Sequence, residues 1–169
     1  YDLGNDLFET FLDNTKMYSC AIFENENSSL EQASINKIER ICKKLALSSN
    51  DHVLEIGTGW GGFAIFAAKN FGCKITTTTI SQKQYEYTLK KVKALGLQDK
   101  ISVLKKDYRD LTGKYNKLIS IEMIEAVGHH YYHDFFRKCN QLLIPDGRML
   151  LQSIIITDYL YEEAKQFSD

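Results

Sequence analysis

Apolar and polar positions alternate with two different periods along most of the chain. Short β-branched runs predict strands over residues 52–56, 74–79, 101–105, 117–122 and 148–156. Between them, apolar positions with helical spacing predict helices over residues 63–71, 81–95 and 131–143. Strands that alternate with helices in this way form parallel sheets with helices on both faces. The pattern therefore predicts a three-layer, doubly wound α/β domain with a mostly parallel sheet.

Residues that favour the beginning or the end of a helix stand at the bounds of these predicted elements. Ser81 is placed to cap the helix that follows it, and Gly96 lies where that helix should end. Pro145, Asp146 and Gly147 predict that the last of these helices ends before the final strand begins.

Residues 1–50 follow a different pattern from the rest. They predict two helices, over residues 6–13 and 30–47, separated by a polar, loop-like stretch. No linker follows, so we expect one continuous domain in which this helical segment joins a core of residues 51–169. Residues 158–169 predict a charged helix with no strand after it. Because doubly wound sheets usually continue beyond this point, we expect C-terminal strands and a lid outside this sequence.

Composition narrows the class of protein. Hydrophobic residues make up 44% of the chain and charged residues 25%, as in ordinary globular domains. With 21 basic and 22 acidic side chains, the net charge of −1 gives no general attraction for nucleic acid. No apolar run approaches the roughly 20 residues of a transmembrane helix. The cysteines form no CxxC pair, which indicates reduced cytoplasmic thiols without a metal site or disulfides; they are Cys20, Cys42, Cys73 and Cys139.

A glycine-rich loop follows the first predicted strand. Gly57, Gly59 and Gly61 open the next helix, at the place where open α/β sheets bind nucleotides. Their spacing is tighter than the dinucleotide fingerprint, and Glu55 lies two residues before the first glycine, as is common in Rossmann-like methyltransferases. The loop therefore favours S-adenosylmethionine as the cofactor. A tight turn without a ligand is the alternative.

The ends of the next two predicted strands supply further candidates. The second strand lacks the acidic residue that NAD-binding domains place on the ribose, so Thr79 and Gln84 would offer neutral hydrogen bonds instead. Asp107 and Tyr108 follow the third strand, where methyltransferases bind adenine. Asp107 would accept from the adenine amine and Tyr108 would cover the ring. A surface ion pair between Asp107 and Arg109 is the alternative interpretation.

Seven stretches along nearly the whole chain form a more specific pattern. They are YDLGNDLF at residues 1–8, YSCA at 18–21, LEQA at 30–33, VLEIGTGWGG at 53–62, TISQKQ at 79–84, DYRDL at 107–111 and IEMIEAVG at 121–128. Together, in this order, they resemble the cyclopropane-fatty-acyl-phospholipid synthase family, which includes the mycolic-acid cyclopropane synthases. The resemblance implies a Rossmann-like class I methyltransferase fold.

The resemblance also implies a reaction and its partners. A cis double bond in an unsaturated phospholipid acyl chain would attack the methyl group of S-adenosylmethionine, and a bound bicarbonate would take a proton as a cyclopropane ring closes. Such an enzyme would act at the membrane surface, peripheral to the inner membrane, with residues 1–50 covering the cofactor and acyl site. The resemblance leaves a homodimer open, and it implies no nucleic-acid partner.

Site residues follow from the same resemblance. The Cys20 amide, the Ile121 carbonyl and the Glu125 carboxylate match bicarbonate-binding positions. Gln152 stands where many members have histidine; it cannot carry a proton but can donate an N–H to an oxyanion. Ala126 replaces a second histidine that many members have, which leaves the product open. The positions that match cofactor contacts are Tyr18, Ser19, Gly57, Gly59, Thr79, Gln84 and Tyr108.

Other interpretations stay open at this stage. Without the resemblance, Cys20 is interpreted as a buried apolar thiol and Glu125 as an acid at the start of a helix. The enzyme could instead methylate a lipid or small molecule without ring closure. The chain could also be a cofactor-binding module without activity, or, least favoured, an NAD-dependent dehydrogenase.

Overall fold

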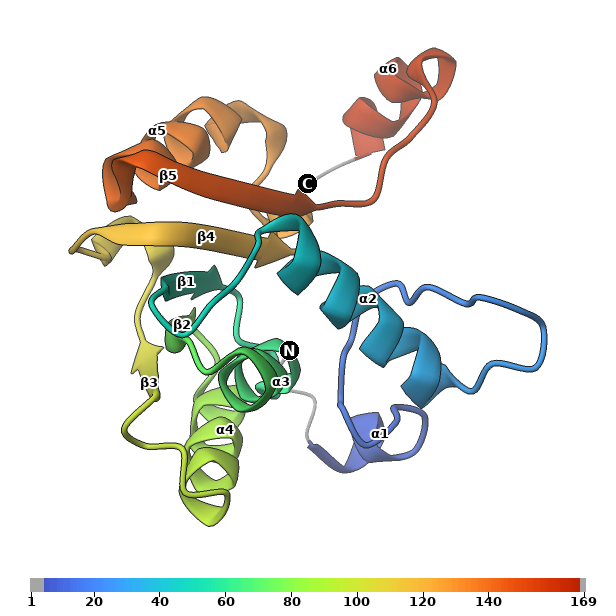
Figure 1. The fold of residues 1–169 in the computed structure, drawn as a ribbon. Helices are drawn as coiled ribbons and strands as arrows, with labels where there is room; N and C mark the ends of the chain where they lie inside the picture. The colour runs from blue at the N-terminus through green and yellow to red at the C-terminus, as the bar shows by residue number, and fades with distance from the viewer. Residues whose placement is uncertain (1–4, 168–169) are drawn as a thin grey trace.

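A parallel sheet lies at the centre of the structure, a computed structural model that describes residues 5–167 (Figure 1). Its strands are β1 (His52–Ile56), β2 (Lys74–Thr79), β3 (Ile101–Lys105), β4 (Tyr115–Ile121) and β5 (Leu143–Gln152). They pair in the order β3-β2-β1-β4-β5, and every neighbouring pair is parallel. The doubly wound parallel sheet expected from the sequence is therefore confirmed.

Six α-helices and three short 3₁₀ helices are found among the described residues. The α-helices are α1 (Asn5–Glu9), α2 (Leu30–Lys44), α3 (Gly62–Phe71), α4 (Gln82–Ala94), α5 (Tyr132–Leu142) and α6 (Asp158–Phe167). The 3₁₀ helices are η1 (Tyr108–Asp110), η2 (Ile124–Ala126) and η3 (His129–Tyr131). None of the helices in the described part of the chain is long and apolar enough to cross a membrane.

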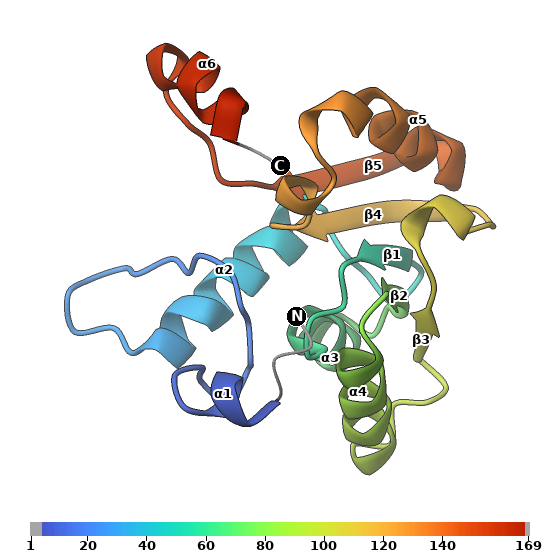
Figure 2. The same ribbon diagram turned by 180° about the vertical axis from the view of Figure 1, so that it is seen from behind.

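Helices cover both faces of the sheet, as the two views show (Figures 1 and 2). Val53 of β1 and Ile119 of β4 join a buried cluster with residues of α2, α3 and α4. Leu54 and Leu118, their sequence neighbours, join a second cluster with residues of α5. Consecutive side chains of a strand point to opposite faces, so each strand contributes to both clusters. The three-layer arrangement is confirmed.

The bounds of three strands agree with the structure, whereas the first helix, predicted over residues 6–13, ends at Glu9. β1, β2 and β3 begin and end at the predicted residues. Ser81 caps α4 by accepting a hydrogen bond from the Gln84 amide at 3.3 Å. In the N-terminal part, Ser29 caps α2 in the same way, with the Gln32 amide at 3.1 Å. The cap predicted at Ser81 is therefore confirmed.

The bounds of the last strand were predicted incorrectly. β5 begins at Leu143 and ends at Gln152, whereas the sequence predicted residues 148–156. Leu143 pairs with Tyr115 and Arg148 pairs with Lys117, so the intervening residues form an irregularity in the ladder. Such a bulge tolerates Pro145 because it does not require that residue's missing N–H. Residues 153–156 then leave the sheet.

The N-terminal and C-terminal helices differ in their contacts with the core. Helix α2 packs on α3, and its buried residues Ile38, Ile41 and Cys42 belong to the same cluster as the sheet. Helix α6 projects away from the sheet in both views (Figures 1 and 2). Residues 1–4 of the first motif and residues 168–169 of the predicted terminal helix lie outside the described residues.

The strand order creates one position where ligands bind in folds of this kind. β1 and β4 are neighbours, and the chain leaves them toward opposite edges of the sheet. Open α/β sheets bind ligands at the carboxyl ends of the strands beside such a switch point. The arrowheads of these strands point toward α2 and the N-terminal segment (Figure 1).

Candidate cofactor and active site

The glycine loop turns sharply from β1 into α3. Gly57, Gly59 and Gly61 have φ values of 101°, 51° and 81°, in the left-handed region. The Gly57 and Thr58 amides both donate to the Thr78 carbonyl, at 3.1 and 2.9 Å. A Cβ on Gly61 would lie 2.8 Å from Thr88 Cγ2, so a side chain there would push α4 away. The loop is thereby fixed against β2 and α4.

Gly59 differs from its neighbours in the space around it. A Cβ on Gly59 would meet no atom of the described residues within 4 Å. Its positive φ and its open surroundings leave backbone exposed at the carboxyl end of β1. A ligand can therefore approach this backbone closely, as expected for a glycine loop that binds S-adenosylmethionine.

Glu55 lies beneath this loop rather than at its surface. Its side chain is 2% exposed, and the carboxylate accepts a hydrogen bond from Thr77 Oγ1 at 2.6 Å. Thr77 Oγ1 in turn lies 2.7 Å from Thr58 Oγ1 in the loop. Burial raises the pKa of the Glu55 carboxyl to about 8, against a smaller opposing effect of the Thr77 hydrogen bond. In the structure Glu55 thus supports the glycine loop from below.

The other predicted cofactor residues lie at the ends of β2 and β3. Thr79 donates to the Gln84 side-chain oxygen at 2.7 Å, and both residues are buried. Asp107 accepts two hydrogen bonds from the Arg109 guanidinium, at 2.9 and 2.7 Å, which hold the pKa of its carboxyl below the usual range. Tyr108 packs edge-on against Phe135, with ring centroids 5.4 Å apart. The ion pair considered as an alternative for Asp107 is therefore present.

An aromatic cluster holds the N-terminal segment against the glycine loop. Trp60 of the loop is 2% exposed, and its ring lies 4.4 Å from that of Phe8 in α1. Tyr18 lies 5.2 Å from Phe8 and 6.5 Å from Trp60, at the exposed edge of the cluster. These contacts bring Tyr18 beside the glycine loop.

Cys20 and Gln152, predicted to bind the same anion, do lie together. The Cys20 amide donates to Glu122 Oε1 at 2.9 Å, and Gln152 Nε2 donates to the same oxygen at 2.7 Å. Gln152 Nε2 also lies 3.3 Å from the Cys20 carbonyl oxygen. Cys20 is exposed, so its interpretation as a buried thiol is wrong. Both predicted donors therefore bind a carboxylate that belongs to the chain itself.

Glu125 and Ile121 lie beside this group. Glu125, in the 3₁₀ helix η2, accepts a hydrogen bond from the Ile154 amide at 2.6 Å. Ile121 is the last residue of β4 and pairs with Gln152 of β5. All four residues predicted for the catalytic position thus lie at the carboxyl ends of β4 and β5 or bind residues there.

A buried lysine adds positive charge to this region. Lys37 of α2 is 1% exposed, and its ammonium donates to Ser19 Oγ at 2.5 Å. Burial lowers the pKa of Lys37 to about 8, and the nearby negative charge of Glu122 acts in the opposite direction. Ser19, which was predicted as a cofactor contact, is a hydrogen-bond partner of this lysine in the structure.

Three residues of this arrangement were not predicted. Lys37 could have been found, because helical spacing places it on the apolar side of α2 with Ala33, Ile38 and Ile41. Glu122 stands directly after a strand at the switch point, which is also a visible signal. Ile154 contributes only its backbone amide, for which the sequence offers no signal.

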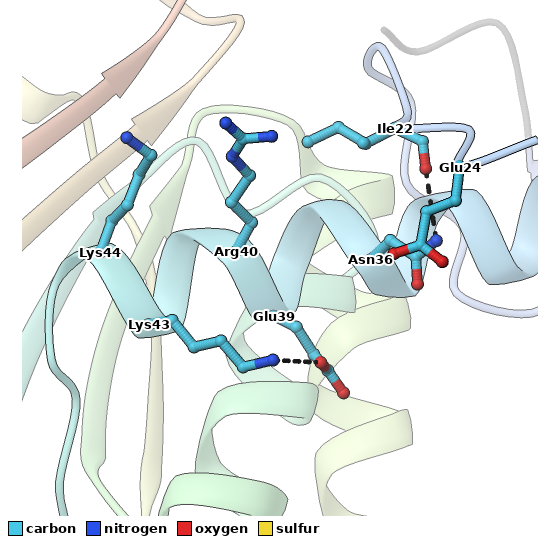
Figure 3. Close-up of a pocket in the computed structure, with 7 residues that line it drawn as sticks. All are labelled: Ile22, Glu24, Asn36, Glu39, Arg40, Lys43 and Lys44. Atoms are coloured by element: carbon cyan, nitrogen blue, oxygen red, sulfur yellow. Dashed lines mark hydrogen bonds and ion pairs between the residues drawn. The ribbon is translucent and has the colours of Figure 1, made fainter.

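A pocket lies along α2 (Figure 3). Within it Lys43 donates to Glu39 at 3.0 Å, and Asn36 donates to the Ile22 carbonyl oxygen at 3.4 Å. Its lining residues are Ile22, Glu24, Asn36, Glu39, Arg40, Lys43 and Lys44. None of the predicted site residues lines this pocket, so we do not assign it to the cofactor.

The sequence and the fold of this chain are similar to those of known proteins. The sequence matches the mycolic acid cyclopropane synthetase family over residues 1–168. The chain belongs to this family. This membership agrees with the resemblance drawn from the sequence.

Individual proteins show a similar likeness. The chain is 38% identical over 154 residues to the cyclopropane-fatty-acyl-phospholipid synthase of Escherichia coli K12, covering 91% of this chain and 39% of that protein. It is 40% identical over 131 residues to a probable fatty acid methyltransferase of Pseudomonas putida, covering 76% of this chain and 33% of that protein. The chain thus spans between a third and two fifths of the length of these relatives.

A solved structure bears on the cofactor. Mycolic acid cyclopropane synthase CmaA1, complexed with SAH and CTAB, matches with a TM-score of 0.86 and 33% identity, covering 89% of this chain and 53% of that one. SAH is the product that remains when S-adenosylmethionine has given up its methyl group. The open backbone at Gly59 fits such a ligand, whereas the donors predicted for bicarbonate are both bonded to Glu122.

We expect Glu55→Gln to reduce the pH dependence of stability. With a folded pKa raised to about 8, folded protein retains a proton that the unfolded chain releases above its ordinary value of 4.5. The free energy of unfolding of the wild type should therefore fall as the pH rises between about 5 and 8, because the folded state binds more protons there. Urea unfolding of the full-length protein across this range should give a shallower fall for Glu55→Gln. The exposed control Glu26→Gln should keep the wild-type slope, and equal slopes in all three proteins would contradict the assignment.

Gly59→Val should weaken S-adenosylmethionine binding without unfolding the protein. The valine side chain would enter the open space beside the loop, where the backbone must approach the ligand. We expect the dissociation constant to rise by about 10²-fold, measured by calorimetry. Gly96→Val is the matched control, because Gly96 also has a positive φ and open surroundings but follows α4. Equal loss of binding in both variants would indicate a general effect of backbone strain instead.

Proposed function

We propose that the full-length protein transfers a carbon from S-adenosylmethionine to the cis double bond of an unsaturated phospholipid acyl chain and closes a cyclopropane ring. The observation that carries the proposal is the common location of two groups. The open backbone of the glycine loop and the carboxylates of Glu122 and Glu125 all lie at the carboxyl ends of β1 and β4. A donor site beside an acidic site suits a reaction that develops positive charge.

Residues on three sides would hold the cofactor. In this proposal the Gly57–Gly61 loop contacts it through backbone, Thr79 and Gln84 offer neutral hydrogen bonds to the ribose, and Tyr108 covers the adenine. Bound S-adenosylmethionine supplies an electrophilic methyl group. Residues 1–50 would cover the cofactor and the acyl chain, since the contact between Phe8 and Trp60 already packs α1 on the loop.

The acidic residues would stabilise the charge that forms on the acyl chain. When the double bond attacks a methyl group, a positive charge remains on the neighbouring carbon, and water must be kept away from it. Glu125 is held at a fixed position by the Ile154 amide, so its negative charge would already be oriented before the reaction. We derive no step through bicarbonate, because Glu122 occupies its predicted donors.

The enzyme would bind peripherally to the cytoplasmic side of a phospholipid bilayer. The similarity to the Escherichia coli cyclopropane-fatty-acyl-phospholipid synthase supports a phospholipid substrate. A second candidate, methylation of an acyl chain without ring closure, is favoured by the similarity to the Pseudomonas putida relative, a probable fatty acid methyltransferase. Both candidates share the attack of an acyl-chain double bond on the methyl group.

Product analysis would distinguish the two candidates. We expect the full-length protein to convert S-adenosylmethionine to SAH only when vesicles contain phospholipid with a cis double bond. Both reactions add one carbon, so NMR of the extracted lipid is required: cyclopropane protons support ring closure, and a methyl or methylene branch supports the second candidate. SAH formation with fully saturated vesicles at the same rate would overturn both.

Glu125→Gln should separate catalysis from cofactor binding. Glutamine keeps an oxygen that can accept the Ile154 hydrogen bond but removes the negative charge. We expect turnover to fall by about 10²-fold, while the dissociation constant of S-adenosylmethionine stays within about twofold of wild type. Single-turnover assays and calorimetry measure the two quantities. Loss of cofactor binding in this variant would show that Glu125 acts in the cofactor site instead.

A further inference from the structure

Glu122 occupies an unusual position for a side chain of the protein itself. One of its carboxylate oxygens, Oε1, accepts hydrogen bonds from the Cys20 amide at 2.9 Å and from Gln152 Nε2 at 2.7 Å. These are the two donors that the sequence analysis assigned to a bound bicarbonate. A carboxylate of the chain itself therefore accepts the two hydrogen bonds that were expected to bind bicarbonate.

The backbone conformation at Glu122 indicates that holding this carboxylate in place costs conformational free energy. Glu122 has a φ of 46°, a left-handed conformation that favours glycine. Its amide donates to the Gln152 carbonyl oxygen at 2.8 Å, so the β5 backbone helps to fix the conformation. Strained residues of this kind persist where surrounding contacts over-determine them, and they concentrate at functional sites.

The surroundings of Glu122 suit a proton acceptor that works next to the cofactor. The following residue, Met123, approaches the glycine loop: a Cβ on Gly57 would lie 3.4 Å from the Met123 Cβ. On the other side, the positive charge of the buried Lys37 interacts favourably with Glu122. The carboxylate also raises the pKa of the neighbouring Cys20 thiol, chiefly through a hydrogen bond, which keeps that thiol protonated. Glu122 thus lies between the glycine loop and the N-terminal segment.

We propose that Glu122 replaces bicarbonate and is the base that removes the proton from the alkylated acyl chain. This inference rests on the proposed function. In the first step, the alkene electron pair bonds to the methyl carbon, the carbon–sulfur pair stays with sulfur, and a cation remains on the second alkene carbon. In the second step, a C–H bond of the transferred methyl breaks, its electron pair closes the ring, and the proton goes to a Glu122 oxygen. Where the proton leaves a neighbouring chain carbon instead, the electron pair forms a double bond.

Turnover without bicarbonate tests the proposal. We would assay full-length wild type, Glu122→Gln and Glu122→Gly with cis-unsaturated phospholipid vesicles in CO₂-free buffer, then add bicarbonate. Wild type should be active without bicarbonate and unchanged by it. Glu122→Gln should retain cofactor binding and lose about 10²- to 10⁴-fold in turnover, as expected for removal of a general base. Glu122→Gly relieves the backbone conformation and vacates the donors, so added bicarbonate should restore part of its activity.

The outcomes separate the two proposals. Glu26→Gln, an exposed glutamate before α2, is the matched control and should behave as wild type. A wild type that requires bicarbonate, or a Glu122→Gln variant as active as wild type, would overturn the role of Glu122 and leave the proposed function standing. A wild type that binds S-adenosylmethionine but never forms SAH with unsaturated lipid would overturn the proposed function and this inference with it.

Discussion

The pairing of β1 with β4 is the constraint on which the site depends. These strands are not consecutive in the chain, and they pair in parallel from Val53 and Lys117 to Ile56 and Ser120. Because parallel strands end at the same edge, the segments that follow them must meet there. The glycine loop after β1 and the acidic segment after β4 are consequently brought into contact. The other site residues are positioned relative to this edge.

The N-terminal segment completes the edge through two kinds of contact. Phe8 packs on Trp60 and excludes water from one side of the glycine loop. The amide of Cys20 binds Glu122, a residue 102 positions further along the chain. Lys37 of α2 brings a buried positive charge to the same place. The acidic segment is therefore oriented only when α1, α2 and the loop between them are docked on the core.

The fold could be predicted largely from local signals. Short β-branched runs predicted the bounds of β1, β2 and β3, since buried parallel strands require continuous apolar or β-branched residues. β5 was placed wrongly because Pro145 and Gly147 indicated a turn, whereas the pairing of Leu143 with Tyr115 is a long-range contact. Bulges depend on the partner strand, and a single sequence does not reveal the partner.

The site was predictable in its location more than in its internal partners. The glycine loop, Cys20, Gln152 and Glu125 were all expected at one edge, and the structure places them there. The sequence could not show that Glu122 binds the donors intended for an anion. That contact joins the ends of β4 and β5 to a distant loop, and no local pattern encodes it.

The aromatic contact at the glycine loop has a spectroscopic consequence. Trp60 is the single tryptophan of the chain, and it lies in the segment that is expected to touch the cofactor. Indole emission responds to the polarity and packing of its immediate surroundings, which here are Phe8 and Tyr18. The tryptophan emission of this chain therefore comes from one known place, and it provides an intrinsic reporter of loop opening that needs no added label.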